Sequence, residues 1–241
     1  MRDYVIVAPP ANTTSAGITG LYKLDRDLRA RGMQSRVITP GDGLQPAPDD
    51  IVVYPDCFSG NMFGAKNVVR MLFMWAGYFG QDKDFPESEY MYYYVPDYIL
   101  NGRNPDNILT IPMIDEERFP YKPLDERSGS CYLAIKYQDY FGNQVTGLPA
   151  DCVRINKQMD IAQLFSEKKT LITFDNSAIN TEAALAGMDV EYRYNPTFEK
   201  RYYWGKYWSY YDVPMSYALQ KQLYRNTWLP QFIQRTQERF S

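Results

Sequence analysis

The first half of the chain alternates short apolar runs with amphipathic stretches. Residues 17–31 are expected to form a helix, because three leucines recur at helical spacing and Gly32 follows as a stop signal. Another helix is expected over residues 66–75, KNVVRMLFMW. Strands are predicted at residues 4–8, 36–39, 51–54, 90–95 and 107–111. This order of elements predicts a Rossmann-like α/β domain.

The second half repeats the alternation on a smaller scale. Helices are predicted over residues 158–167 and 177–186, the second of which ends at Gly187. Strands are predicted at residues 131–136, 152–155 and 171–174, and again from Val190. The strand at 131–136, CYLAIK, is expected to end in Lys136. A second, smaller parallel sheet is therefore expected in this half.

The segment between the halves, residues 113–130, is rich in proline and charge and shows no periodicity. This composition is typical of an interdomain linker, whose bounds we set at residues 121–130. The domains are then expected at residues 1–120 and 131–212, followed by a terminal helix at 213–241. The expected fold class is α/β, with two Rossmann-like domains and a long C-terminal helix that packs back on the body.

A Tyr- and Trp-rich stretch precedes the terminal helix. Residues 192–211 interleave aromatic with basic side chains, so sugar stacking, membrane-surface contact and a packed connector are all open. The large area that aromatic side chains bury favours the connector. The helix is expected at about residues 215–239, interrupted near Pro230, and its polar surface favours a docked helix over a membrane anchor. Three of its apolar side chains are expected to face the body of the protein: Leu219, Leu223 and Phe232.

Composition excludes several classes of function. The 26 basic and 29 acidic residues nearly balance, which argues against a dedicated nucleic-acid binder. The sequence contains no histidine, so Ser–His–Asp and Cys–His catalysis and histidine-ligated metal sites are ruled out. Acid–base chemistry must then fall to carboxylates, Lys, Tyr or the substrate. The three cysteines, Cys57, Cys131 and Cys152, match neither a zinc pattern nor a disulfide framework and suit a reducing compartment.

The chain also lacks the apolar signals of membrane insertion. No apolar run approaches the roughly 20 residues that span a bilayer, and the N-terminus lacks the core of a signal peptide. A cytoplasmic protein without a transmembrane segment is therefore expected, either free or at the inner membrane surface. The abundance of Tyr and Trp leaves room for a homodimer but does not require one.

The candidate site is the turn that joins the last predicted strand to its following helix in the second half. Open α/β sheets bind ligands at this carboxyl end of their strands. Asn176 is expected to be the helix N-cap, so the backbone N–H groups of Ser177 and Ala178 would attract an anion such as a phosphate. Asp175 and Glu182 are seven residues apart, about two helical turns, and are expected to face the same crevice.

Two further patterns carry weaker signals. The loop Gly17-Ile18-Thr19-Gly20 lacks the GxGxxG fingerprint, so NAD is not indicated. Ligand contact and a tight turn with close helix packing both remain open for this loop. Aspartates two residues apart occur at Asp25 and Asp27, within a predicted helix, and at Asp82 and Asp84, within a charged loop. Neither pair follows a strand as a metal-binding donor motif should, and we interpret both as solvated charge.

Three segments resemble the retaining group 1 glycosyltransferases of the GT-B fold. SAGITGLYKLDRDLRARG resembles their glycine loop and first helix, which ends in "RG" before the second strand. VVRMLFMWAGYFGQDKDFPESE resembles a segment in which a helix leads into a "PG" loop, with Ala76-Gly77 in place of Pro-Gly. LITFDNSAINTEAALAGMDV resembles the donor-site segment, in which an aspartate loop precedes a helix bearing "EAxxxG". The resemblance covers most of residues 4–191.

The resemblance implies a glycosyltransferase of carbohydrate biosynthesis. Such an enzyme moves a sugar from a nucleotide-diphosphate donor to a glycan or other hydroxyl acceptor, with retention and with no metal or other cofactor. Glu182 matches the glutamate that binds the nucleotide ribose, and Lys136 matches a basic residue beside the donor diphosphate. Asn176, Ser177 and Ala178 would offer helix N-terminal amides to the phosphates or the sugar.

The remaining correspondences are looser. Gly17 and Ile18, in the first domain, would approach the diphosphate. The usual acidic pair of the family is spaced eight apart, which places Phe174 at the first position. Asp175, one residue later, would be presented to the donor sugar. Many relatives carry a histidine near the reacting centre, and typical members are longer than 241 residues.

Two other classes of function remain open. One is a catalytically silent GT-B-like protein that binds glycans or nucleotides. The other is a different doubly wound enzyme that acts on phosphorylated small molecules.

Overall fold

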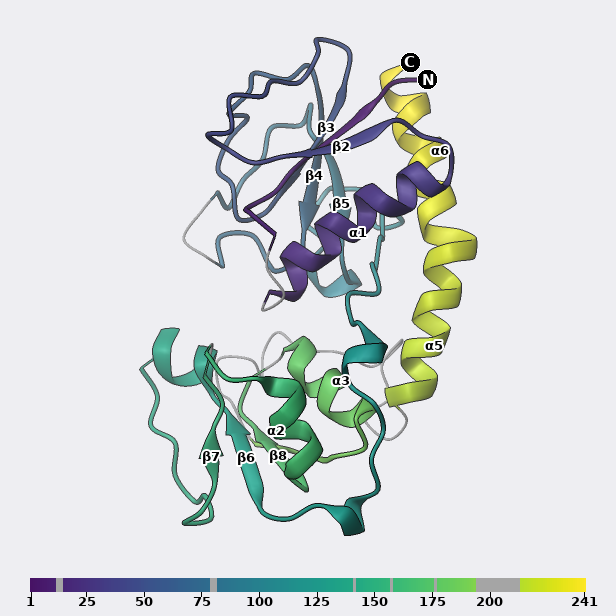
Figure 1. Cartoon of the computed structure of the whole chain (residues 1–241). Coiled ribbons are helices and arrows are strands. Elements are labelled where there is room, and N and C mark those ends of the chain that lie inside the picture. Colours follow the sequence, from purple (N-terminus) through teal and green to yellow (C-terminus); the bar gives the residue numbers. More distant parts are fainter. Residues whose placement is uncertain (12–14, 79–81, 141, 157, 176, 194–212) are drawn as a thin grey trace. The chain divides into compact units, whose positions relative to one another are not determined.

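The computed structural model describes residues 1–11, 15–78, 82–140, 142–156, 158–175, 177–193 and 213–241. The chain divides into two units. The first unit comprises residues 1–113 and 218–241, and the second comprises residues 114–217. Each unit is built around a parallel β-sheet, so the α/β class and the two separate sheets are confirmed (Figure 1).

The first sheet is parallel throughout and has the order β2-β1-β3-β4-β5. Its strands are β1 (Tyr4–Val7), β2 (Ser35–Ile38), β3 (Ile51–Pro55), β4 (Asn67–Leu72) and β5 (Tyr90–Tyr93). Helix α1 (Ala16–Ala30) joins the first two strands, and a short turn η1 (Pro96–Tyr98) follows the last. The chain therefore runs outward to β2 first and then returns past β1 to β3, so the strand order reverses between β1 and β3.

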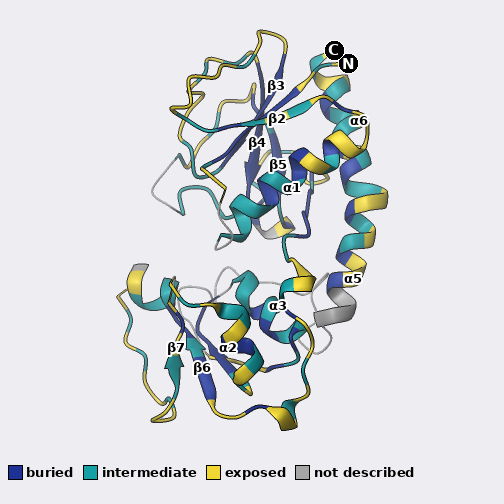
Figure 2. Ribbon diagram, viewed as in Figure 1, coloured by how far each residue is buried: buried dark blue, intermediate teal, exposed yellow. Residues whose placement is uncertain are grey.

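Two helices cover one face of this sheet. Leu21, Leu24 and Leu28 of α1 share a core with Tyr4 of β1 and with Phe232 of the C-terminal helix. The Phe232 ring also contacts the Tyr92 ring edge-on, at 4.8 Å between centroids. Figure 2 shows these helices buried along one side and exposed along the other. The opposite face of the sheet is covered by loop side chains instead: Phe58, Phe63 and Ala65.

The helix predicted over residues 66–75 is wrong, because residues Asn67–Leu72 form strand β4. All six of its residues are buried, and it pairs with β3 on one side and β5 on the other. A central parallel strand is apolar on both faces, so its sequence lacks alternation and resembles a buried helix. The strand predicted at residues 107–111 is reduced to a single bridge between Tyr93 and Ile108.

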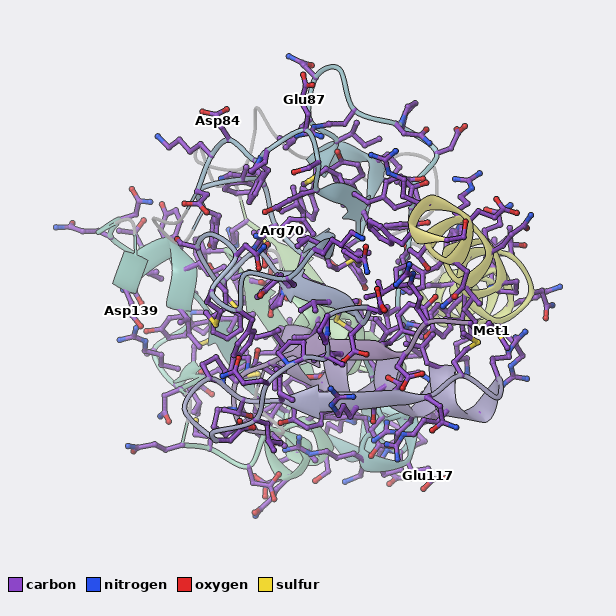
Figure 3. All side chains as sticks on the ribbon, turned by 90° about the horizontal axis from the view of Figure 1, so that it is seen from above. Met1, Arg70, Asp84, Glu87, Glu117 and Asp139 are labelled. Atoms are coloured by element: carbon purple, nitrogen blue, oxygen red, sulfur yellow. The ribbon has the colours of Figure 1, made fainter. Side chains whose placement is uncertain are left out.

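The only charged residue of β4, Arg70, is fully buried. Its Nε and Nη2 donate to the two carboxylate oxygens of Glu89, at 2.8 and 3.0 Å. Its Nη1 and Nη2 also donate to the backbone carbonyls of Phe58 and Gly60. The guanidinium lies 5.0 Å from the centre of the Tyr54 ring. Arg70 therefore holds the loops on the face of the sheet that no helix covers. Figure 3 shows Arg70 in the interior, whereas the exposed Asp84 and Glu87 lie at the edge.

The second sheet is also parallel and has the order β7-β6-β8-β9. Its strands are β6 (Ser130–Leu133), β7 (Val153–Arg154), β8 (Thr170–Thr173) and β9 (Asp189–Tyr192). A π-helical turn, η4 (Ile135–Tyr140), follows β6, and helices α2 (Ile161–Glu167) and α3 (Ala178–Leu185) precede and follow β8. The strand order reverses between β6 and β8. Gly187, with a positive φ of 91°, terminates α3 as expected.

The segment that enters the second unit is tied to the ends of two helices. It contains the short turns η2 (Glu116–Arg118) and η3 (Leu124–Glu126). The Lys122 N–H and the Arg127 guanidinium both donate to the carbonyl of Ala186, at the C-terminus of α3. The Lys122 ammonium donates to the carbonyl of Ser166 in α2. This segment therefore packs as part of the second unit.

The C-terminal helix is interrupted as expected, but by a π-helical turn. It consists of α5 (Val213–Leu223), η5 (Tyr224–Trp228) and α6 (Leu229–Phe240), and Pro230 is the second residue of α6. Phe232 is buried as predicted, whereas Leu219 is 47% exposed and Leu223 is half-buried. The prediction for Leu219 is therefore wrong. Three other residues of these helices are buried instead: Tyr217, Gln220 and Tyr224.

The structure leaves the interpretation of the Tyr- and Trp-rich stretch open. Residues 194–212, which make up nearly all of it, lie outside the described residues, so sugar stacking, membrane-surface contact and a packed connector all stay open.

Among the helices that are described, none is both long enough and apolar enough to cross a bilayer.

Candidate functional site

The candidate site lies at the carboxyl ends of β6 and β8, the two strands between which the second sheet reverses its order. This is where open α/β sheets bind their ligands. The turn η4, which follows β6, carries Lys136. Asp175 and the start of α3, with Ser177 and Ala178, follow β8. The structure therefore brings these four predicted residues to one edge of one sheet.

A small hydrogen-bond network fixes the end of β8. The Thr173 hydroxyl donates to the carbonyl of Asp175 at 2.9 Å and accepts from its N–H at 3.2 Å. The Asn180 side-chain amide donates to the same carbonyl at 2.8 Å. The main chain of Asp175 is thus held by one residue of β8 and one residue of α3, both of them buried.

The Asp175 carboxylate accepts backbone hydrogen bonds from η4. Its Oδ2 accepts from the Lys136 N–H and its Oδ1 from the Tyr137 N–H, both at 2.8 Å. The residue is only 4% exposed. Burial raises the pKa of Asp175, and the hydrogen bonds and the Lys136 charge oppose that rise. The structure thus gives this carboxylate a backbone partner for each oxygen.

Lys136 does not end the strand as predicted. Strand β6 stops at Leu133, and Lys136 is the second residue of η4, where it is half-buried. The Gln138 N–H donates to the carbonyl of Ala134 at 2.8 Å, so the chain turns immediately after the strand. Burial lowers the pKa of Lys136, and the charge of Asp175 opposes that fall.

The N-cap of α3 is Ser177, whereas Asn176 was expected. The Ser177 hydroxyl accepts from the Ile179 N–H at 3.4 Å. Asn176 itself lies outside the described residues. Because serine caps as readily as asparagine, local sequence preference does not decide between the two neighbours. The positive end of the α3 dipole still begins at Ser177 and Ala178, as the anion-binding hypothesis requires.

Glu182 lies in the second turn of α3. Asp175 precedes the helix, so counting two turns from it does not place Glu182 on the same face. Asn180 is the residue of α3 that contacts Asp175, and Glu182 lies about 200° round the helix from it. Burial raises the pKa of Glu182 to about 7, and the charge of Arg118, from η2, opposes the rise. Glu182 therefore has a positive charge near it within its own unit.

Gly17 and Ile18 begin α1 in the first unit. The α1 N-cap is Ser15, whose hydroxyl accepts from the Ile18 N–H at 3.5 Å. A Cβ added to Gly17 would meet no atom within 4 Å, so close packing does not explain that glycine. A Cβ added to Gly20 would meet the Met113 side chain at 3.1 Å. The close-packing interpretation therefore applies to Gly20 and not to Gly17.

The first unit contains a second strand-end aspartate that sequence analysis missed. Asp56 directly follows β3, and its Oδ2 accepts from the N–H groups of Phe73 and Met74, at 3.0 and 2.7 Å. These two residues follow the neighbouring strand β4. Burial raises the pKa of Asp56 to about 7, and the hydrogen bonds and the Arg70 charge oppose the rise. The sequence signal was an aspartate two residues after the strand predicted at 51–54, whereas Asp175 directly follows the strand predicted at 171–174.

The aspartate pairs are only partly the solvated charge that was predicted. Asp25 is buried and pairs with Arg29 one turn along α1, and Asp27 pairs with Lys23 at 2.8 Å. Asp82 accepts from the Gly60 N–H at 2.6 Å, and Asp84 is exposed. The prediction is therefore wrong for Asp25. Within the described parts of the chain, no three His, Cys, Asp or Glu side chains gather as a metal site would require, and Cys57, Cys131 and Cys152 are free thiols.

Comparison with known proteins leaves the site to be interpreted by its geometry. No protein-family model matches this chain, and no curated protein matches it in sequence.

Proposed function

We propose that this chain is a glycosyltransferase with two Rossmann-like, GT-B-like domains, which transfers a sugar from a nucleotide-diphosphate donor to a glycan or other hydroxyl acceptor. One observation carries the proposal. A lysine-bearing turn and a helix N-terminus meet where the second sheet reverses its strand order. Both groups favour an anion, and this edge of a parallel sheet is where such folds bind nucleotides.

The donor diphosphate is the ligand that this edge suits best. The N-terminus of α3, at Ser177 and Ala178, is the positive end of the helix dipole, and Lys136 adds an ammonium group. When the bond between the sugar and the diphosphate breaks, negative charge accumulates on the departing phosphate. A fixed ammonium and helix dipole stabilise that charge more than they stabilise the bound donor, and this difference lowers the barrier. Lys136 is therefore the proposed catalytic residue.

Glu182 is the proposed ribose ligand. A carboxylate accepts hydrogen bonds from the two ribose hydroxyl groups, provided that it is ionised. Because burial raises the pKa of Glu182 to about 7, this contact should strengthen as the pH rises through neutrality. Its neighbour Arg118 belongs to the same unit and favours the ionised form.

A second candidate function is a catalytically silent protein that binds a nucleotide or a glycan through the same edge. The Asp175 carboxylate favours this alternative, because each of its oxygens already accepts a backbone N–H and the residue is 4% exposed. It is therefore badly placed to contact a donor sugar. Donor turnover, measured as release of the nucleoside diphosphate, separates the two candidates.

A thermal-shift screen tests the proposed nucleotide site. Uridine, guanosine and adenosine diphosphates, with and without attached sugars, would be compared on the wild type, on Lys136→Met and on Lys169→Met. Lys169 is an exposed lysine of the same unit and serves as the matched control. A ligand that binds the native state raises the melting temperature by mass action. We expect a shift for one base, kept by Lys169→Met and reduced by Lys136→Met. Absence of a shift with every diphosphate at millimolar concentration would contradict the proposal.

A further inference from the structure

We propose that Asp175 is a positioning residue, whose carboxylate holds the turn that carries Lys136 and joins that turn to the N-terminus of α3. The role of Lys136 as a ligand of the donor diphosphate rests on the proposed function. The hydrogen bonds of Asp175 do not depend on that function.

The hydrogen bonds of Asp175 leave it little capacity for any other task. Its Oδ2 and Oδ1 each accept one of two successive N–H groups, those of Lys136 and Tyr137, at 2.8 Å. A carboxylate that accepts adjacent amides at the start of a helical turn caps that turn, although Asp175 lies 38 and 39 residues further along the chain. Since the residue is 4% exposed, its oxygens face the turn and not a ligand.

The support behind Asp175 comes from two other elements. Thr173, in β8, bonds to both the N–H and the carbonyl of Asp175, and Asn180, in α3, donates to the same carbonyl. One residue therefore connects η4, the end of β8 and the first turn of α3. The two groups that would hold a diphosphate, the lysine and the helix N-terminus, are fixed relative to each other through it. A phosphate site must be preorganised in this way if it is to stabilise charge at the moment of reaction.

The charge of Asp175 also acts on Lys136. Lys136 is half-buried, and loss of hydration disfavours its ammonium form, whereas the neighbouring carboxylate favours it. Among the described residues, the same turn and the adjoining elements also carry titratable or charged groups: Tyr132, Tyr137, Glu182 and the exposed pair of Asp139 with Arg154 of β7, at 2.7 Å. Loss of the Asp175 charge should thus lower the pKa of Lys136 further. At neutral pH a smaller fraction of the lysine would then be charged.

The test measures the titration of Lys136 directly and needs no substrate. The full chain would be acetylated briefly with acetic anhydride across a pH series, and modification of Lys136 would be quantified by mass spectrometry of its peptide. Only the neutral amine reacts, so the midpoint of the reactivity curve reports its pKa. The variants are Asp175→Asn and, as matched control, Asp56→Asn. Asp56 is a strand-end carboxylate that also accepts two backbone amides, but it belongs to the first unit.

We expect Asp175→Asn to move the Lys136 midpoint down by about one pH unit or more, and Asp56→Asn to leave it in place. Thr173→Val, which removes the hydroxyl that supports Asp175 at nearly constant volume, should move the midpoint in the same direction by less. This variant decides the question if Asp175→Asn does not fold. An unchanged midpoint in the folded variants would overturn the positioning role. A shifted midpoint in a protein that binds no nucleotide diphosphate would retain that role and reject the proposed function alone.

Discussion

The two units use a strand-end aspartate in the same way and attach different chemistry to it. Asp56 and Asp175 each follow a parallel strand, and each accepts two successive N–H groups from the loop after a neighbouring strand. In the first unit the aspartate joins β3 to β4, which lie beside the point where the strand order reverses. In the second unit it joins β8 to β6, the two strands at the reversal itself.

The side chains on the loops differ as well. The loop that Asp56 holds presents Phe73 and Met74, which are half-buried against apolar neighbours. The loop that Asp175 holds presents Lys136. In both units the aspartate therefore has a structural role, because its carboxylate holds the loop after a neighbouring strand. A candidate site arises only where this aspartate lies at the reversal of the strand order and the loop that it holds carries a charged group.

The units also differ in what covers their sheets. In the second unit, helices lie in the connections on either side of β8. In the first unit, the connections around β4 contain no helix among their described residues, and the buried pair of Arg70 and Glu89 holds the loops there. In the first unit the ion pair therefore adds to the apolar contacts that hold these loops, such as those of Phe58 and Phe63.

The largest effect is expected when that pair is broken. Arg70→Met leaves the Glu89 carboxylate buried without its partner and frees two loop carbonyls, so the free energy of unfolding of the first unit should fall by about 3–5 kcal/mol. Hydrogen exchange followed by mass spectrometry would locate the loss. The control, Arg154→Met, breaks the exposed pair with Asp139 and should cost less than about 1 kcal/mol. Equal losses in the two variants would contradict the structural role of Arg70.

The next effect concerns pH and Asp56. Its folded pKa of about 7 lies above the ordinary aspartate pKa of 3.8, so the folded protein binds more protons than the unfolded chain between those values. The contribution of Asp56 to stability is therefore complete below about pH 4 and is lost as the pH rises toward 7, at most about 1.4 kcal/mol per pH unit. Asp56→Asn should remove this part of the slope. Chemical denaturation at pH 5 and pH 8 measures it, and an unchanged slope in the variant would contradict the assignment.

Asp175→Asn should separate the two aspartates by function. We expect turnover to fall about tenfold or more, because the turn and the charge of Lys136 are both disturbed, while donor affinity changes less. Asp56→Asn should keep wild-type turnover. The measurement is turnover at saturating donor beside the donor dissociation constant from calorimetry. Loss of affinity alone, with turnover preserved, would show that Asp175 supports binding and not the reaction.

A smaller effect is expected at Glu182. Glu182→Gln should weaken nucleotide binding several-fold, because one hydrogen bond to an ionised group contributes about 1.5–3 kcal/mol and the amide retains part of it. Wild-type affinity should also rise between pH 6 and pH 8, and that rise should disappear in the variant. Glu191→Gln, on an exposed residue of β9, is the control for net charge. A folded Glu182→Gln protein with wild-type affinity at pH 8 would exclude the ribose contact.

The smallest effect is expected at the start of α1. Gly17→Ala places a methyl group where no atom lies within 4 Å and where φ is not positive, so stability should stay level or rise by less than about 1 kcal/mol. If Gly17 approaches the diphosphate, donor affinity should nevertheless fall. Gly20→Ala, whose added methyl group requires the Met113 side chain to shift, should be less stable than Gly17→Ala. Unchanged affinity in Gly17→Ala would remove Gly17 and its loop from the proposed donor site.

Much of the fold could be predicted from local pattern, because most strands are short runs rich in apolar or aromatic residues between turn signals. Strand β4 could not, since a strand buried on both faces loses the alternation that distinguishes it from a helix. The exposed position of Leu219 and the buried position of Asp25 depend on which neighbours each helix meets, and helical spacing alone does not specify that.

The candidate site was predictable in position but not in detail. Topology alone brings Lys136 and Asp175 to one edge, because the carboxyl ends of parallel strands meet there. The hydrogen bonds between Asp175 and η4 join residues 38 and 39 apart, which no local pattern encodes. Asn180 was missed because an asparagine inside a predicted helix gives no sign that it bonds to the preceding turn.

The central claim is that an anionic nucleotide ligand binds at the reversal of the second sheet. Its most direct test is amide hydrogen exchange of the wild-type chain with and without the nucleoside diphosphate that gives the largest thermal shift. We expect new protection in the peptides that cover residues 135–140 and 177–180. Protection confined to the first unit, or none in these two peptides at saturating ligand, would contradict it.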